Sequence, residues 1–414
     1  MNFELDLVQS SALALILLLL GEIARNRIGF LSRFSIPGPV IGGFFFALLA
    51  LLLRQTGVAE IEFDTTLQTP AMVAFFSTIG LGGSLAMMKK GGKLLVVYLI
   101  ACWTVAIMQN LIGIGMANAV GVDPMLGIMA GATSLEGGHG AAAAFGPTAE
   151  QMGTTGATEV AIAAATFGLV AGSLLGGPIA GWLMKRRRVT VPSEDKLKVG
   201  VLSGGGSAGA DIAEDQGSTD EPEHAAGYRD MLAIAVMIGV IMVMGILLGD
   251  WFTDVTGFAL PAYVGAMVIA VIFRNINDKL GWFKIDDRSV DLISKFTLGF
   301  FLTQAMMSLK IWELANLALP LIIILVVQVV FLILFAVFVV FRMMGRNYDS
   351  VTMVSGLIGH GLGATPNALA NMDAFNSRFG VRSEKAFLIV PLAGAMLIDM
   401  VALPWIVWCM NWVA

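Results

Sequence analysis

Two glycine-rich stretches of the chain carry the residues whose types and spacing suit the binding of a small ligand. Residues 124–150 contain a Gly-His-Gly triplet centred on His139, and residues 350–373 contain another centred on His360. Glycines leave backbone N–H and C=O groups open to a ligand, and the start of a helix presents the positive end of its dipole to an anion. A single histidine in an apolar setting is usually structural, but two in matching triplets make a role in binding as well supported as a structural one.

The residues expected to contact a bound anion are small, hydroxyl, amide and histidine residues of these stretches. Thr365 is expected to cap a helix that has Pro366 at its first position. Asn367 and Asn371 are four residues apart and therefore share one face of that helix. The full predicted set is Ser134, Gly137, Gly138, His139, Gly140, His360, Gly361, Gly363, Ala364, Thr365, Asn367 and Asn371.

Charge in these stretches is scarce, which limits how an anion can be held. No lysine or arginine lies near the middle of any long apolar segment. Helix ends, hydroxyls and amides must therefore hold the anion, unless a basic residue near a mouth of the site, such as Arg378 or Arg382, takes part.

A cation such as sodium prefers hard oxygen ligands, which carbonyls and Thr, Gln, Asp and Glu side chains supply. The predicted cation region consists of Thr133, Glu136, Gln109, Gln328 and Asp399. Ionisable residues are costly inside a membrane and count as functional candidates there. That argument applies to Asp399, whereas Glu159, near the end of its apolar segment, is expected either to function or simply to face water. Glu136 precedes His139 by three residues, so it is expected to ligate an ion or to pair with that histidine.

The composition of the chain indicates that these residues lie in a membrane. The chain has 414 residues, of which 57% are hydrophobic and 13% charged, whereas a soluble domain has about 25% charged residues. Long unbroken apolar runs, such as 317–341, are typical of helices rather than of β-barrel strands. This excludes a soluble enzyme, a nucleic-acid-binding protein and a secreted disulfide scaffold. Cys102 and Cys409 are expected to be buried thiols.

The rule that a spanning helix needs about 20 apolar residues predicts an all-α polytopic membrane protein with ten transmembrane helices. The stretches 124–150 and 350–373 are apolar but too interrupted to span, so each is predicted to be a re-entrant hairpin between the fourth and fifth helices of its half. The predicted spans are 8–25, 36–54, 70–88, 94–120, 157–184, 228–249, 257–273, 290–309, 316–341 and 384–412. The first of them lacks a cleavage-site pattern and is read as a span rather than a signal peptide.

The basic residues predict the orientation. With the N-terminus outside, 23 of the 25 lysines and arginines lie on the cytoplasmic side, and only Arg54 and Lys310 lie outside, in agreement with the positive-inside rule. If either hairpin crossed the membrane, this alternation would fail. Both termini are therefore expected on the outer side.

The same topology divides the chain into two inverted five-helix repeats, residues 1–185 and 228–414. Residues 186–227, rich in glycine, serine and acidic residues, are predicted to be a flexible cytoplasmic linker.

Sequence matches support the repeat. GLVAGSLLGGP from Gly168 and GAMLIDMVALP from Gly394 share a glycine and a proline ten residues apart, and Ser173 aligns with Asp399. Inverted repeats with broken elements at mid-membrane are typical of secondary transporters. A channel is less well supported because polarity is confined to the hairpins, and an enzyme because no paired nucleophile and base or H-E-x-x-H motif occurs. Glycines outside the hairpins are expected to serve helix packing: Gly113, Gly115, Gly172, Gly176 and Gly177.

At longer motifs the chain resembles the bacterial sodium/glutamate symporter family. These motifs run from the first span to the last and leave out only the linker and the termini; they include IPGPVIGGF (36–44), MQNLIGIGMA (108–117), ATEVAIAAATFGLVAG (157–172) and HGLGATPNALANM (360–372). The first hairpin departs from the family pattern S-G-G-H-G-T-G, because Glu136 precedes Gly137 and Ala141 follows Gly140. The added carboxyl group could alter the substrate or ion preference.

The resemblance implies uptake of glutamate driven by a sodium gradient across the bacterial inner membrane, with sodium as the coupling ion and no other cofactor. It also implies ten spans, both termini in the periplasm, and a homodimer whose moving core carries the hairpins against a scaffold. The alternative is a sodium- or proton-coupled symporter for another dicarboxylate or amino acid. Neither reading implies an enzymatic activity or a nucleic-acid partner.

Overall fold

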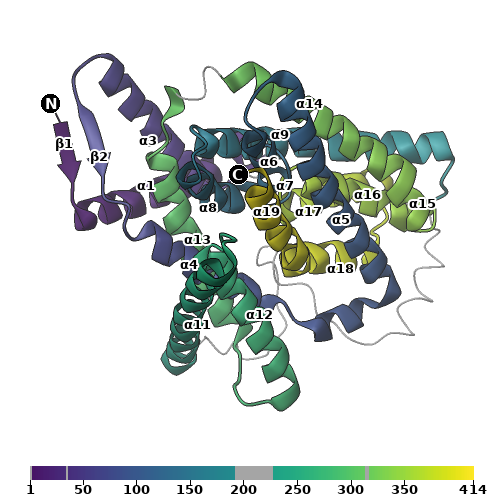
Figure 1. Ribbon diagram of the computed structural model, residues 1–414. Coiled ribbons are helices and arrows are strands. Elements are labelled where there is room, and N and C mark those ends of the chain that lie inside the picture. The colour runs from purple at the N-terminus through teal and green to yellow at the C-terminus, as the bar shows by residue number, and fades with distance from the viewer. Residues whose placement is uncertain (1, 34–35, 192–226, 313–316) are drawn as a thin grey trace.

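The computed structural model describes residues 2–33, 36–191, 227–312 and 317–414 (Figure 1). Most of the predicted linker, residues 192–226, lies outside the described residues. The first half of the chain contains α1 (Leu7–Arg27), α2 (Gly29–Arg33), α3 (Gly38–Gln55), α4 (Gln68–Gly82), α5 (Leu85–Val120), α6 (Pro124–Met129), α7 (Ala132–Leu135), α8 (Gly138–Gln151) and α9 (Ala157–Arg187).

The second half of the chain also contains both long and short helices. It contains α11 (Tyr228–Thr256), α12 (Ala262–Leu280), α13 (Asp287–Met307), α14 (Ala318–Phe335), the π-helix η2 (Ala336–Val340), α15 (Phe341–Met343), α16 (Tyr348–Gly361), α17 (Thr365–Phe379), α18 (Glu384–Leu392), the π-helix η3 (Ala393–Leu397) and α19 (Asp399–Val413).

The prediction of an all-helical membrane protein is confirmed, and the structure adds to it one small sheet near the N-terminus. Strands β1 (Asn2–Leu5) and β2 (Glu60–Phe63) pair in parallel, with Asn2 opposite Glu60 and Leu5 opposite Phe63. The segment Glu-Ile-Glu-Phe alternates exposed and half-buried residues, which is the period of a strand. Every other regular element that the structure describes is helical.

Six helices within the described residues are long and apolar enough to cross a membrane: α1, α3, α5 from Gly92 onward, α9, α11 and the run from α14 to α15. The other four predicted spans correspond to α4, α12, α13 and the run from α18 to α19. α4 has only 15 residues, α12 and α13 carry charged residues near one end, and η3 interrupts the last helix. These features explain why helix length and hydropathy identify the six helices above as membrane-spanning but not these four.

The helices pack in two groups. α1, α3, α4, α11, α12 and α13, called here the scaffold helices, pack mainly on one another, and the core helices α5–α9 and α14–α19 do the same. Figure 1 shows the scaffold helices toward the left and bottom of the view and the core helices toward the right. Contacts between the groups are fewer and run mainly through α8 on α13, η3 on α4, and α12 on α5 and α19.

Close approach at glycine holds matching pairs of scaffold helices together. A Cβ added to Gly42 of α3 would lie 1.9 Å from the carbonyl oxygen of Leu17 of α1, and one added to Gly245 of α11 would lie 2.2 Å from Cα of Ala266 of α12. Small residues at such crossings let membrane helices pack by dispersion where no hydrophobic effect drives them together.

The predicted packing glycines of the core are partly confirmed. Gly113, Gly172 and Gly176 each face a neighbouring element, and a Cβ on Gly113 would lie 2.0 Å from the carbonyl oxygen of Gly127. For Gly115 and Gly177 the prediction is wrong, because a Cβ there would meet nothing within 4 Å. The prediction for the cysteines is confirmed, since Cys102 and Cys409 are buried and free.

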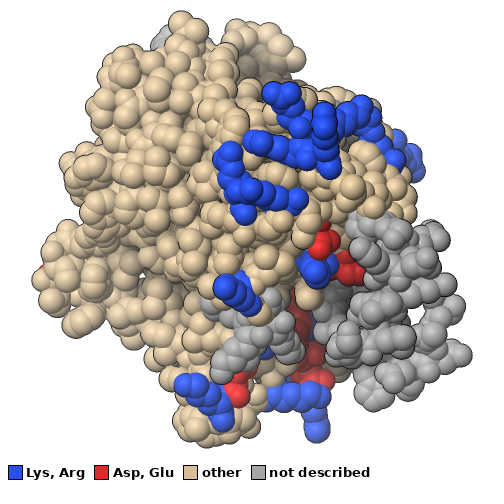
Figure 2. All heavy atoms as spheres, turned by 90° about the vertical axis from the view of Figure 1, so that its right-hand side faces the viewer, with Lys and Arg blue, Asp and Glu red and all other residues tan. Residues whose placement is uncertain are grey.

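The surface reflects the composition of the chain. Large apolar side chains are exposed along α1, α11 and α14, as expected of helices that face lipid. Figure 2 shows that Lys and Arg side chains on the face it views gather toward one side, while the rest of that face is almost uncharged.

Candidate functional site

Both predicted hairpins are helix–break–helix units, and their tips touch. In the first, Glu136 and Gly137 separate α7 from α8, and in the second, Leu362 to Ala364 separate α16 from α17. Gly138 has φ 62°, where a side chain is strained, and a Cβ there would lie 3.1 Å from the carbonyl oxygen of Gly363. Two breaks in regular backbone, from halves of the chain far apart in sequence, therefore meet at one place.

Helix α9 packs against the tips of both hairpins. At Gly168 a Cβ would lie 2.3 Å from the carbonyl oxygen of Leu362 of the second hairpin and 2.7 Å from a side-chain carbon of Leu135 of the first. His139 of the first hairpin also reaches α9, since its Nε2 lies 3.0 Å from Oγ1 of Thr166.

The two asparagines of the second hairpin are hydrogen-bonded to the same helix, α9. Nδ2 of Asn367 donates to the carbonyl oxygen of Leu169 at 2.8 Å, and its Oδ1 accepts from Ser173 Oγ at 2.9 Å. One turn further on, Nδ2 of Asn371 donates to the carbonyl oxygen of Gly172 at 2.9 Å. The shared face predicted for Asn367 and Asn371 is confirmed, and both side chains hold α17 against α9.

The start of α17 differs from its prediction. Thr365 is the first helical residue and Ala364 the N-cap, so the prediction that Thr365 caps the helix is wrong. The threonine hydroxyl donates instead to the carbonyl oxygen of Gly394 in η3, at 2.9 Å. A Cβ on Gly394 would lie 3.1 Å from two ring atoms of His360. The Thr365 side chain therefore makes a tertiary hydrogen bond to η3 in place of a local capping bond.

His360 itself is buried at 4% exposure, and neither ring nitrogen has a hydrogen-bond partner among the described residues. Buried polar groups are almost always partnered. An imidazole with two open nitrogens beside a helix break therefore points to a ligand or water that it meets in the working protein.

Gln109 and Gln328 link α5 and α14 to the second hairpin. Nε2 of Gln109 donates to the carbonyl oxygen of Gly361 at 2.7 Å, and Nε2 of Gln328 donates to the carbonyl oxygen of Gln109 at 2.6 Å. The Oε1 atoms of both glutamines and Oγ1 of Thr133 are buried and have no hydrogen-bond partner among the residues that the structure describes. Three hard oxygens of the predicted cation region are thus available to an ion.

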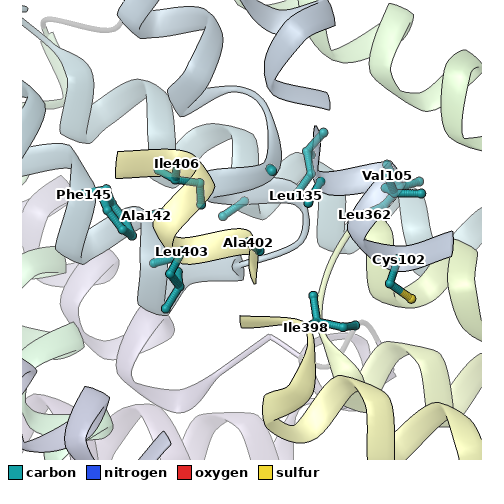
Figure 3. Close-up of a cluster of buried hydrophobic side chains, with 14 of the residues drawn as sticks. Cys102, Val105, Leu135, Ala142, Phe145, Leu362, Ile398, Ala402, Leu403 and Ile406 are labelled. Carbon is teal, nitrogen blue, oxygen red and sulfur yellow. The ribbon is translucent and has the colours of Figure 1, made fainter. Parts of the chain in front are cut away.

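Glu136 is the first of the two carboxyl groups in this region. It is 6% exposed, and both of its oxygens lack a hydrogen-bond partner within the described chain. Helix α7, which ends just before Glu136, contacts α19, which begins at Asp399. Figure 3 shows the hydrophobic cluster around its neighbour Leu135, to which Cys102 of α5 and Ala402 of α19 also belong. A carboxyl group in such surroundings needs a proton or a cation.

Other predicted residues have different surroundings. Ser134 donates to the carbonyl oxygen of Met129 at 2.5 Å, inside its own hairpin. Gly140 lies near Leu298 of α13, where the first hairpin meets the scaffold. Glu159 is buried and its Oε1 accepts from the backbone N–H of Lys310 at 2.9 Å, so the alternative that it simply faces water is wrong.

Several residues of the site were not predicted from the sequence. Thr166 and Ser173 of α9 each bond to a hairpin, and Oδ1 of Asn110 accepts from the N–H of Ala132 at 2.9 Å. One signal could have found the first two, because Glu159, Thr166 and Ser173 are spaced by seven and form a polar stripe on one face of the helix.

The side chains of the predicted cation region are oxygen donors. No group of three or more His, Cys, Asp or Glu residues able to hold a metal occurs in the part of the chain that the structure describes. What the site presents is amide and hydroxyl oxygens with two carboxyl groups, a set suited to alkali ions. The first turns of α8 and α17 add backbone N–H groups that have no partner within their helices.

A polytopic helical protein in which the tips of two broken-helix hairpins touch has the architecture of the class of membrane transporters. Comparison with known proteins identifies the family within this class. The family model for the sodium/glutamate symporter matches residues 3–381, and the chain belongs to that family.

Its similarity to individual members extends over nearly the whole length. It is 40% identical over 404 residues to the sodium/glutamate symporter of Escherichia coli strain K12, covering 96% of each chain. It is also 40% identical to that of Haemophilus influenzae, over 97% of this chain and 96% of that one. Among solved structures, the sodium proton antiporter MjNhaP1 from Methanocaldococcus jannaschii aligns over 97% of this chain and 100% of its own, with 12% identity and a TM-score of 0.42.

Proposed function

We propose that this protein is a sodium-driven symporter that imports glutamate across the bacterial inner membrane by alternating access. The observation that carries the proposal is the 40% identity over 96% of both chains to a protein named a sodium/glutamate symporter. The site is consistent with it, because it offers both an anion-binding and a cation-binding set of groups.

The substrate carboxylates would lie at the starts of α8 and α17. Each of these helices begins at the contact between the hairpin tips, and each has more than three turns behind it, with 14 and 15 residues. The N–H groups of Gly138, His139 and Thr365 are therefore the proposed donors, supported by the two helix dipoles. Buried His360 adds a further open donor.

Sodium would lie beside the substrate among the oxygens of Gln109, Gln328, Thr133, Glu136 and Asp399. All these residues belong to the core helices. A cation held there would lower the cost of bringing an anion next to two carboxyl groups, and this would make the binding of sodium and of substrate mutually favourable.

Alternating access would arise from movement of the core against the scaffold. The core carries both hairpins and contacts the scaffold less extensively than either group packs within itself. In this proposal the chain has ten spans in two inverted repeats, 1–185 and 228–414. Both termini are periplasmic, the linker 186–227 is cytoplasmic, and two copies form a homodimer.

Radiolabelled glutamate uptake into proteoliposomes tests the proposal. Purified protein should accumulate glutamate when sodium is higher outside, and should not do so in choline chloride of equal ionic strength. Asn371→Ala should reduce uptake by loosening α17 from α9, whereas Asn118→Ala, an exposed asparagine on α5, serves as the matched control. Absence of glutamate uptake, or uptake indifferent to sodium, would refute the proposal.

Glu136 favours a second candidate, a symporter coupled to protons or specific for another dicarboxylate or amino acid. Its two oxygens lack a hydrogen-bond partner among the described residues, and a carboxyl group in that state fits a proton as well as a sodium ion. In the same vesicles, uptake driven by an inward proton gradient without sodium identifies the first form. Stronger competition by aspartate or a dicarboxylate than by unlabelled glutamate identifies the second.

A further inference from the structure

A cluster of arginines lies away from the site, where two core helices end. Arg187 at the end of α9, Phe341 and Arg342 of α15, and Arg346 just beyond α15 line a depression of about 340 Å³. The face that Figure 2 views includes this side of the molecule, and basic side chains gather there. Among the described residues, no acidic residue lines the depression.

The charge of these arginines is not compensated within the described part of the chain. None of Arg187, Arg342 and Arg346 takes part in a recorded ion pair there, whereas Arg274 and Lys295 do. Arg342 gives one N–H to the carbonyl oxygen of Phe338 at 2.5 Å, which leaves the rest of its guanidinium open. The depression therefore carries three exposed arginines that form no ion pair with another described residue.

An exposed apolar stripe leads along the membrane helix to the same place. Leu319, Val326, Val330, Leu334 and Phe338 are exposed at helical spacing along α14 and η2. Arg342 follows Phe338 by four residues, at the end of this apolar run. From Leu319 to Arg342 a helix rises about 35 Å, which is close to the hydrocarbon thickness of a bilayer. The stripe thus offers a path for acyl chains that ends at guanidinium groups at headgroup level.

We propose that this depression binds the phosphate headgroup of an anionic phospholipid, with its acyl chains along the α14 stripe. Guanidinium groups recognise phosphate oxygens by paired hydrogen bonds. Basic pockets between membrane helices at the cytoplasmic surface suit such headgroups. The site is separate from the transport site, and its lipid would hold the ends of α9 and α15 together.

Native mass spectrometry of the purified protein in detergent tests the proposal, with cardiolipin and phosphatidylcholine as probes. Cardiolipin should remain bound and phosphatidylcholine should not. Each arginine near a membrane surface contributes roughly a factor of five to binding, so the triple variant R187Q/R342Q/R346Q should weaken cardiolipin binding about a hundredfold. K279Q/K284Q/K295Q, which removes three exposed lysines of the scaffold, should bind cardiolipin like the wild type.

Further outcomes of this experiment distinguish a bound phospholipid from other ligands of the depression. Equal loss of binding in both triple variants would overturn the proposal, since any cationic surface would then serve. Displacement of the lipid by millimolar inorganic phosphate would also overturn it, because the site would then recognise phosphate without acyl chains. If the triple arginine variant fails to fold, R346Q alone should weaken binding about fivefold, and no change in this variant would count against the site.

Discussion

Asn367→Ala should weaken the attachment of the second hairpin to α9. The amide makes two hydrogen bonds across this junction, to the carbonyl oxygen of Leu169 and from the hydroxyl of Ser173, and the side chain is 1% exposed. A buried hydrogen bond contributes about 1 kcal/mol net, so the loss of two predicts a destabilisation of about 2 kcal/mol. Because one kcal/mol moves the midpoint by roughly 2–4 °C in smaller domains and by less in a longer chain, a fall of about 3 °C is expected.

The assay is thermal unfolding of detergent-solubilised protein, followed by tryptophan fluorescence. Asn118→Ala is the control, because its amide bonds only to the carbonyl oxygen of Ile114 within α5 and a surface change costs within about 0.5 kcal/mol. Ser173→Ala should cost about half as much as Asn367→Ala. In the double variant the two effects should fall short of their sum by about 1 kcal/mol, the energy of the shared bond. Strict additivity, or an Asn367→Ala midpoint equal to that of the control, would show that the junction does not hold the hairpin.

Three further predictions concern other parts of the molecule. Arg274→Ala should destabilise the scaffold by about 3 kcal/mol in the same unfolding assay, because it strips Asp278 of a 2.9 Å ion pair in which the arginine side chain is only 11% exposed; wild-type stability would contradict this. Gly245→Leu should abolish the well-folded peak in size-exclusion chromatography, since even a Cβ would lie 2.2 Å from Cα of Ala266, and Gly239→Leu, where a Cβ meets nothing within 4 Å, should elute normally. Asp399→Asn should raise the sodium concentration needed for half-maximal uptake by roughly tenfold, which corresponds to about 1.4 kcal/mol of lost sodium binding. An unchanged sodium titration would remove Asp399 from the site.

The sequence predicted the two helix breaks better than the hydrogen bonds that surround them. The matched histidines, the glycine content and the distribution of lysine and arginine placed both hairpins where helix breaks occur. The shared face of Asn367 and Asn371 followed from helical spacing. Their partners on α9 did not, because Asn367 and Leu169 are 198 residues apart in the chain and no local rule connects them.

Where prediction failed, a tertiary contact outweighed a local preference. Thr365 has the right chemistry for a cap, yet its hydroxyl bonds to Gly394 of η3. The π-helices η2 and η3 carry no sequence signal of their own, since each is a single inserted turn within an apolar run. Strand β2 shows a two-residue alternation in only four residues, too few to separate from chance.

The attachment of the second hairpin to α9 has a consequence for how the protein is made. The polar face of α9 is synthesised with the first half, but its partners Asn367 and Asn371 emerge almost 200 residues later. At about 5–20 residues per second of synthesis, α9 waits roughly 10–40 seconds in the membrane with Ser173 and the neighbouring backbone lacking their final partners. During that interval the nascent chain exposes a polar stripe to lipid or to the insertion machinery. The half-made protein is therefore the state most open to misassembly and proteolysis, and the core is completed only when the last hairpin arrives.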